Sequence, residues 1–89
     1  MLEREIGVVN RLGLHARAAA KLVHLASGYR SAVTLFVDGE EVDAKSILGI
    51  LLLAAAQGTS VVVRCDGDDE GEAMRGIQAL FAERFGESE

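Results

Sequence analysis

The sequence predicts an α+β fold in which a four-stranded antiparallel sheet is covered on one face by three helices. Two observations predict it. Segments rich in β-branched residues alternate with segments of helical periodicity in the order β-α-β-β-α-β-α, and the pair Asp38-Gly39 is typical of a tight hairpin turn. The chain has 89 residues, of which 49% are apolar, and this is enough for one core without disulfide bonds.

The first strand and the first helix are separated by a loop. Residues 3–9 alternate loosely between polar and apolar side chains, which predicts a strand. Asn10 and Gly13 are typical turn residues of the loop that follows. Residues 16–27 place apolar side chains at helical spacing and Gly28 is a stop signal, so we expect a helix there.

A hairpin and a central strand complete the predicted sheet. Residues 32–37 alternate, and residues 40–43 return after the turn as a second short strand. Residues 59–65 are continuous and β-branched, which favours a central strand.

Two more helices have recognisable starts. Ser46 is a good N-cap for the second helix, which we expect Gly58 to end. Asp69 with Glu72 three residues later forms a capping box that predicts the start of the third helix. The third helix places four large apolar side chains along one face: Met74, Ile77, Phe81 and Phe85.

The second helix has no polar face between residues 47 and 56. A domain of this size cannot surround a wholly apolar helix, which disfavours complete burial. We expect one stripe of this helix to pack on the sheet and another to remain exposed as a docking patch.

Composition excludes several classes of function. The net charge of −5 and the four aromatic rings argue against a nucleic-acid partner. Cys65 is the only cysteine, which excludes an internal disulfide and a cysteine-cluster metal site, and we expect neither metal nor cofactor. Met1 is followed by Leu-Glu-Arg-Glu rather than by a basic start and an apolar stretch, which argues against a signal peptide. The longest apolar run is far shorter than the roughly 20 residues of a membrane span. We therefore expect a cytoplasmic protein without membrane insertion.

The segment N-R-L-G-L-H-A-R, residues 10–17, concentrates the chemistry of the chain. It places His15 at the start of a helix, where backbone N–H groups lack partners and attract anions. Imidazole can act as a nucleophile near neutral pH, and Arg17 supplies a cation suited to phosphate oxygens. We expect a basic patch around this site, formed by four residues: Arg11, Arg17, Lys21 and Lys45. His24 belongs to no motif and is interpreted as a surface residue.

This segment resembles the active-site segment of HPr, the histidine-containing phosphocarrier family of the bacterial phosphoenolpyruvate-dependent sugar phosphotransferase system. The run Lys45-Ser46-Ile47-Leu48-Gly49 is similar to the second signature of that family, and Ala56-Gln57-Gly58 continues it. The resemblance covers residues 1–89 as a single domain and implies the family's open-faced β-sandwich.

The resemblance also implies a reaction. His15 would accept a phosphoryl group on Nδ1 from a phosphohistidine of enzyme I and pass it to the IIA component of a sugar permease, while Arg17 would stabilise the phosphate. Such a protein is an intermediate carrier of phosphoryl groups rather than a stand-alone turnover enzyme. We expect it to act as a monomer.

The resemblance further implies a regulatory site and a docking surface. Ser46 would be the regulatory serine that HPr kinase/phosphorylase modifies in many bacteria. Ile47, Leu48 and Leu51 match positions that dock enzyme I and IIA components. The charged rim of this surface would be formed by three residues: Arg11, Lys21 and Lys45.

Ala18 departs from the family pattern, because members usually have proline directly after H-A-R. Proline in a first turn is pre-organised, and its replacement by alanine is worth about 0.4–1 kcal/mol, too little to abolish the site. The departure leaves an alternative open: a nitrogen-related or purely regulatory HPr paralogue that acts as a phosphorylation-dependent binding protein.

Overall fold

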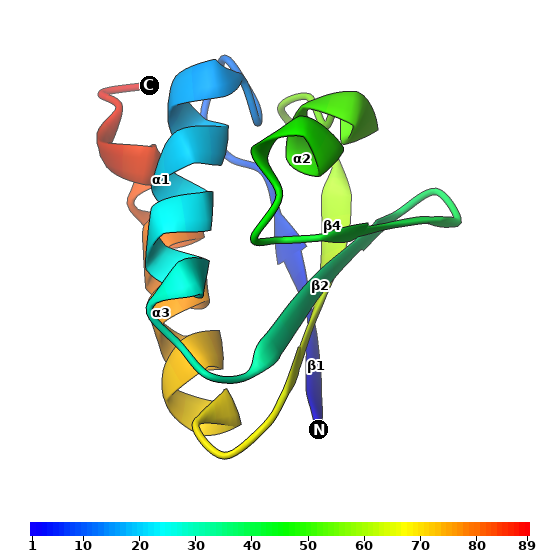
Figure 1. Ribbon diagram of the computed structural model, residues 1–89. Coiled ribbons are helices and arrows are strands. Elements are labelled where there is room, and N and C mark those ends of the chain that lie inside the picture. Colours follow the sequence, from blue (N-terminus) through cyan, green and yellow to red (C-terminus); the bar gives the residue numbers. More distant parts are fainter.

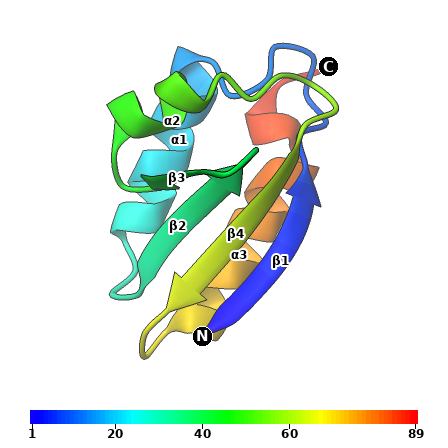
Figure 2. The same ribbon diagram turned by 90° about the vertical axis from the view of Figure 1, so that its right-hand side faces the viewer.

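The computed structural model describes residues 1–89 and contains one four-stranded sheet with helices on one face (Figures 1 and 2). The strands are β1 (Leu2–Gly7), β2 (Ala32–Val37), β3 (Glu40–Asp43) and β4 (Ser60–Asp66). The helices are α1 (Ala16–Ser27), α2 (Ile47–Leu53) and α3 (Glu70–Ala82), followed by the 3-10 turn η1 (Arg84–Gly86). The predicted fold class and the predicted order of elements are confirmed.

The strand order is β1-β4-β2-β3, and every neighbouring pair is antiparallel. β4 is a central strand, as its β-branched run predicts. Every second residue of β4 points into the core, so that Val61, Val63 and Cys65 are fully buried. None of the helices is long and apolar enough to cross a membrane.

The core lies between the sheet and the pair α1 and α3, which pack side by side (Figure 1). The buried face of α1 includes Ala18, the residue at the proline position, which is fully buried in the first turn. His24 lies on the exposed face of α1, as expected.

Several strand ends differ from the prediction by one residue, and the ends of β1 and α2 differ by more. β1 ends at Gly7, and the N–H of Val8 donates to Thr59 O outside the strand ladder. α2 ends at Leu53, well before Gly58, because Ala54 adopts a left-handed conformation with φ 51° and its N–H returns to Leu51 O. α2 is therefore a helix of seven residues.

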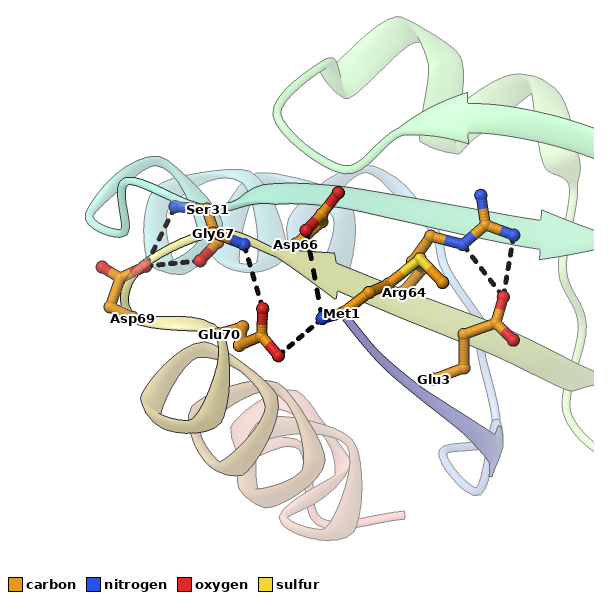
Figure 3. A network of polar contacts seen from close by, with 8 residues as sticks. All are labelled: Met1, Glu3, Ser31, Arg64, Asp66, Gly67, Asp69 and Glu70. Atoms are coloured by element: carbon orange, nitrogen blue, oxygen red, sulfur yellow. Dashed lines mark hydrogen bonds and ion pairs between the residues drawn. The ribbon is translucent and has the colours of Figure 1, made fainter.

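The predicted capping box at the start of α3 is wrong. The carboxylate of Asp69 caps nothing in α3, since it accepts hydrogen bonds from Ser31 N and Ser31 Oγ at 2.9 and 2.6 Å (Figure 3). It also accepts one from Arg30 N at 2.9 Å. These donors lower the pKa of Asp69 to about 2. Glu70, the next residue, accepts a hydrogen bond from Gly67 N at 3.2 Å. The carboxylate of Asp69 thus ties the loop after α1 to the start of α3.

Phe85 lies beyond α3, in η1, and not on the helix as predicted. Its side chain is still buried, with its ring centroid 4.9 Å from that of Phe81. Arg84 and Phe85 both have φ 56°, so the chain reverses after α3. The segment that follows lies beside the loop preceding α1 in both views (Figures 1 and 2).

Candidate functional site

His15 is the N-cap residue of α1, with extended backbone angles φ −75° and ψ −179°. Its carbonyl oxygen accepts the first bond of the helix from Ala19 N at 2.8 Å. No side chain caps the first turn, and no acidic residue belongs to it. The backbone N–H groups of this turn are therefore available to an anion next to the imidazole.

The loop before His15 is held from two directions. Gly13 has φ +69°, and a Cβ atom at this position would lie 2.4 Å from Ala55 O. Leu14 N donates to the same Ala55 O at 2.9 Å. Asn10 is fully buried and its Nδ2 donates to Gly13 O at 2.8 Å. Asn10 and Gly13 are thus loop-shaping residues, as expected.

Three of the predicted basic residues gather near His15. Arg11, Arg17 and Lys21 line a surface cavity of about 420 Å³ together with residues 86–89. Arg11 pairs with Glu89 at 2.8 Å, and Lys21 Nζ donates to Phe85 O at 2.6 Å. The Arg17 side chain is exposed and forms no hydrogen bond or ion pair within the chain.

The expectation of a basic patch needs correction, because two carboxylates from the end of the chain lie in it. Glu87 Oε2 accepts a hydrogen bond from His15 Nε2, and Glu87 Oε1 accepts one from Asn10 Nδ2 at 2.9 Å. The bonds from Asn10 and then from His15 lower the pKa of Glu87, with a smaller contribution from the charge of Arg17. Glu87 is thus an ionised member of the site.

The sequence contains no local signal for Glu87. It lies 72 residues from His15, and it is one of several glutamates near the end of the chain that belong to no motif. Only the reversal of the chain after α3 brings the two side chains together.

The docking patch expected on α2 is exposed. Ile50 is fully buried, whereas four other large side chains are 37–71% exposed and form what we call the α2 patch: Ile47, Leu48, Leu51 and Leu52. α2 packs against α1 (Figure 1). The exposure of Ile47, Leu48 and Leu51 agrees with the expectation, while their role in docking stays a prediction.

Ser46 and Lys45 are placed differently from each other. Ser46 Oγ accepts from Gly49 N at 3.1 Å, which confirms the predicted N-cap. Lys45 Nζ donates to Tyr29 O at 3.0 Å, beyond the C-terminal end of α1. Since the 12 residues of α1 rise about 18 Å, the Lys45 ammonium group lies far from His15.

Comparison with known proteins identifies the family. The family model described as "PTS HPr component phosphorylation site" matches residues 2–83. The phosphocarrier protein HPr of Xylella fastidiosa is 56% identical over 98% of both chains, and that of Cupriavidus necator is 52% identical over the full length of both. The crystal structure of HPr-C-His from Thermoanaerobacter tengcongensis is 42% identical, with a TM-score of 0.96 over all of both chains.

Two other relatives bear on branch and assembly. The phosphocarrier protein NPr of Shewanella violacea is 38% identical over 98% of this chain and 96% of its own. A crystal structure of an HPr dimer from Thermoanaerobacter tengcongensis has a TM-score of 0.79 at 42% identity and covers 98% of this chain and 100% of that one. With a family match across nearly the whole sequence and a fold that superposes over its full length, the chain belongs to the HPr family of phosphocarrier proteins of the phosphotransferase system.

Proposed function

We propose that His15 accepts a phosphoryl group on Nδ1 from the phosphohistidine of enzyme I and passes it to IIA components for sugar uptake. One observation carries this proposal. The imidazole lies at the uncapped start of α1 with its Nε2 bonded to Glu87, while Nδ1 has no hydrogen bond and is free to attack. The side chain of His15 is 27% exposed, which leaves it accessible to a partner.

Stabilisation of the transferred group would come from two sources. The free N–H groups in the first turn of α1 would stabilise an anion bound at the adjacent imidazole, and Arg17 has no internal partner that would compete for its guanidinium. Phosphoryl transfer between two imidazole nitrogens requires mainly positioning and charge stabilisation, and both features supply these.

The docking of partners would involve the α2 patch and the cations near His15. Leu48 and Leu52 are 65% and 71% exposed, which is unusual for leucine and favours contact with another protein. Arg11 and Lys21 would add charge complementarity toward acidic surfaces of enzyme I and the IIA components.

The proposal is tested by incubation with enzyme I and labelled phosphoenolpyruvate. The expected result is an acid-labile, base-stable phosphate on His15. His15→Ala should abolish the label and leave the circular dichroism spectrum unchanged, whereas Arg17→Ala should slow labelling. Unmodified His15 in the presence of active enzyme I would overturn the proposal, and an unchanged rate in the Arg17 variant would remove Arg17 from the mechanism.

We also propose that HPr kinase/phosphorylase regulates the carrier at Ser46. The hydroxyl is half-buried and borders the α2 patch, so a phosphate there would add about two negative charges beside the surface that docks acidic partners. Incubation with the kinase and ATP, followed by mapping of the phosphate, tests this role. We place the carrier in the cytoplasm, where these partners act, and propose that it works as a monomer.

The alternative assignment is a nitrogen-related or regulatory paralogue. The full-length relative named NPr supports it, although its 38% identity is lower than the 56% and 52% of relatives named HPr. The two assignments are distinguished by measuring, side by side, how fast the phosphorylated protein transfers its phosphoryl group to a sugar-specific IIA component and to a nitrogen-related one.

A further inference from the structure

Glu87 is held in a defined orientation beside His15. One carboxylate oxygen accepts from His15 Nε2 and the other from Asn10 Nδ2 at 2.9 Å. Only 12% of the Glu87 side chain is exposed. Asn10 is itself fully buried, and its amide donates only to Gly13 O and to Glu87.

The segment around Glu87 is fixed on both sides. Two residues earlier, Phe85 is buried and its carbonyl oxygen accepts from Lys21 Nζ at 2.6 Å. Two residues later, the backbone oxygen of Glu89 accepts from Arg11 N at 3.0 Å. These bonds attach the segment to α1 and to the loop before it, so the carboxylate has a constant position relative to the imidazole.

The chemistry of this contact determines which ring nitrogen can react. An ionised carboxylate can only accept a hydrogen bond, so Nε2 of His15 must carry the proton. A neutral imidazole with its proton on Nε2 has its lone pair on Nδ1, and Nδ1 has no hydrogen bond in the chain. The lowered pKa of Glu87 keeps the carboxylate ionised at neutral pH.

We propose that Glu87 is a positioning residue for phosphoryl transfer, which holds the His15 ring through Nε2–H and directs the lone pair of Nδ1 outward. This inference rests on the proposed function of His15. In the transfer step, the Nδ1 lone pair forms a bond to phosphorus while the bond from phosphorus to the donor nitrogen breaks, and its electron pair returns to the donor. The proton stays on Nε2.

The hydrogen bond between Glu87 and His15 would also stabilise the positive charge that the ring gains during phosphoryl transfer. Since the ring keeps its Nε2 proton, it gains positive charge as Nδ1 bonds phosphorus. The carboxylate of Glu87 stabilises that charge, as a carboxylate does when it is bonded to a histidine that accepts a proton. A charge-assisted hydrogen bond is roughly twice as strong as a neutral one, so removal of the charge should slow transfer by about tenfold.

Glu87→Gln is the test variant, because it keeps the size of the side chain and removes the charge. Glu83→Gln is the matched control, since it removes the same charge from an exposed side chain four residues earlier that has no hydrogen bond or ion pair. We expect Glu87→Gln to lower kcat for phosphorylation by enzyme I about tenfold with little change in KM, and Glu83→Gln to leave kcat unchanged. A change in KM alone would overturn a positioning role.

Nitrogen NMR of the unphosphorylated protein gives a readout independent of transfer. In the unmodified protein, Nε2 should carry a slowly exchanging proton and Nδ1 should show the shift of an unprotonated nitrogen. Glu87→Ala should accelerate exchange of that proton and mix the two tautomers. If the protein with the parent sequence is labelled on His15, and both Glu87 variants match the control in kcat and in ring spectra, this inference fails while the carrier function stands. If the unmodified protein takes no label, the proposed function fails, and the ring spectra still decide the position of the proton.

Discussion

Replacement of Gly13 by alanine should destabilise the protein more than the same change at Gly39. Gly13 has φ +69°, and a left-handed backbone costs a residue with a Cβ about 1–2 kcal/mol. The added Cβ would also lie 2.4 Å from Ala55 O and 3.0 Å from Ala56 Cα. Both are backbone atoms that cannot rotate away, and overpacking of this kind costs about 1–3 kcal/mol. We expect the free energy of unfolding to fall by about 2–5 kcal/mol.

Gly39→Ala separates the two contributions. Gly39 has φ +82°, similar to Gly13, but no atom lies within 4 Å of a Cβ built there. It should therefore lose only the conformational part, about 1–2 kcal/mol. The gain from a less flexible unfolded chain applies to both variants and cancels in the comparison. Urea unfolding followed by circular dichroism measures the two free energies.

The difference between the variants is the quantity that decides. A gap of about 1–3 kcal/mol corresponds to at least about 4 °C in Tm for a domain of this size. Equal losses in Gly13→Ala and Gly39→Ala would refute the conclusion that close approach to Ala55 constrains the loop. Because the same loop positions His15, Gly13→Ala should also slow labelling by enzyme I, whereas Gly39→Ala should not.

Three further predictions concern Asp69, α2 and Ser46. The hydrogen bonds from Ser31 and its neighbour hold the pKa of Asp69 at about 2, below 3.8, so their contribution to stability is complete above about pH 4 and is lost as the pH falls toward 2. Asp69→Asn should flatten the dependence of unfolding free energy on pH across that window in urea titrations. Ile50→Ala should cost about 2–5 kcal/mol of stability because Ile50 is fully buried. Leu48→Ser should change stability by less than about 0.5 kcal/mol and raise the KM of enzyme I for this protein. Ser46→Ala should lose the cap and about 1 kcal/mol in thermal unfolding, whereas Ser46→Asp should keep the cap and slow phosphorylation by enzyme I.

The sequence predicted those features that depend on neighbouring residues. The spacing of apolar side chains predicted α1 with its observed bounds, and the pair Asp38-Gly39 predicted the hairpin of β2 and β3. The position of His15 at a helix start and the N-cap at Ser46 follow from the same local rules. The exposed α2 patch was predicted because a wholly apolar helix cannot be buried in a small domain.

The wrong or missing predictions involve partners distant in the sequence or a backbone conformation that the residue type does not signal. Asp69 has a sequence context typical of a capping box, but Ser31, 38 residues away, provides better donors. α2 ends early because Ala54 adopts a left-handed conformation, for which alanine gives no signal. Glu87 is given no role by the sequence, because only the folded chain shows that it contacts His15. Local propensity cannot predict contacts that the tertiary fold creates.

The loop before α1 is held against the residues that follow α2, so the α2 patch and His15 are connected through direct backbone contacts. The Ala55 carbonyl, two residues after α2, accepts from Leu14 N at 2.9 Å, and Gly13 packs directly against it. A partner that docks on α2 therefore finds the imidazole at a constant distance from its contact surface. Since misplacement of a reacting group by about 1 Å can reduce a rate about 100-fold, this contact should contribute to the proposed transfer by holding His15 in place. It follows that Gly13→Ala should lower transfer even at temperatures where the variant is fully folded, which separates loss of positioning from loss of stability.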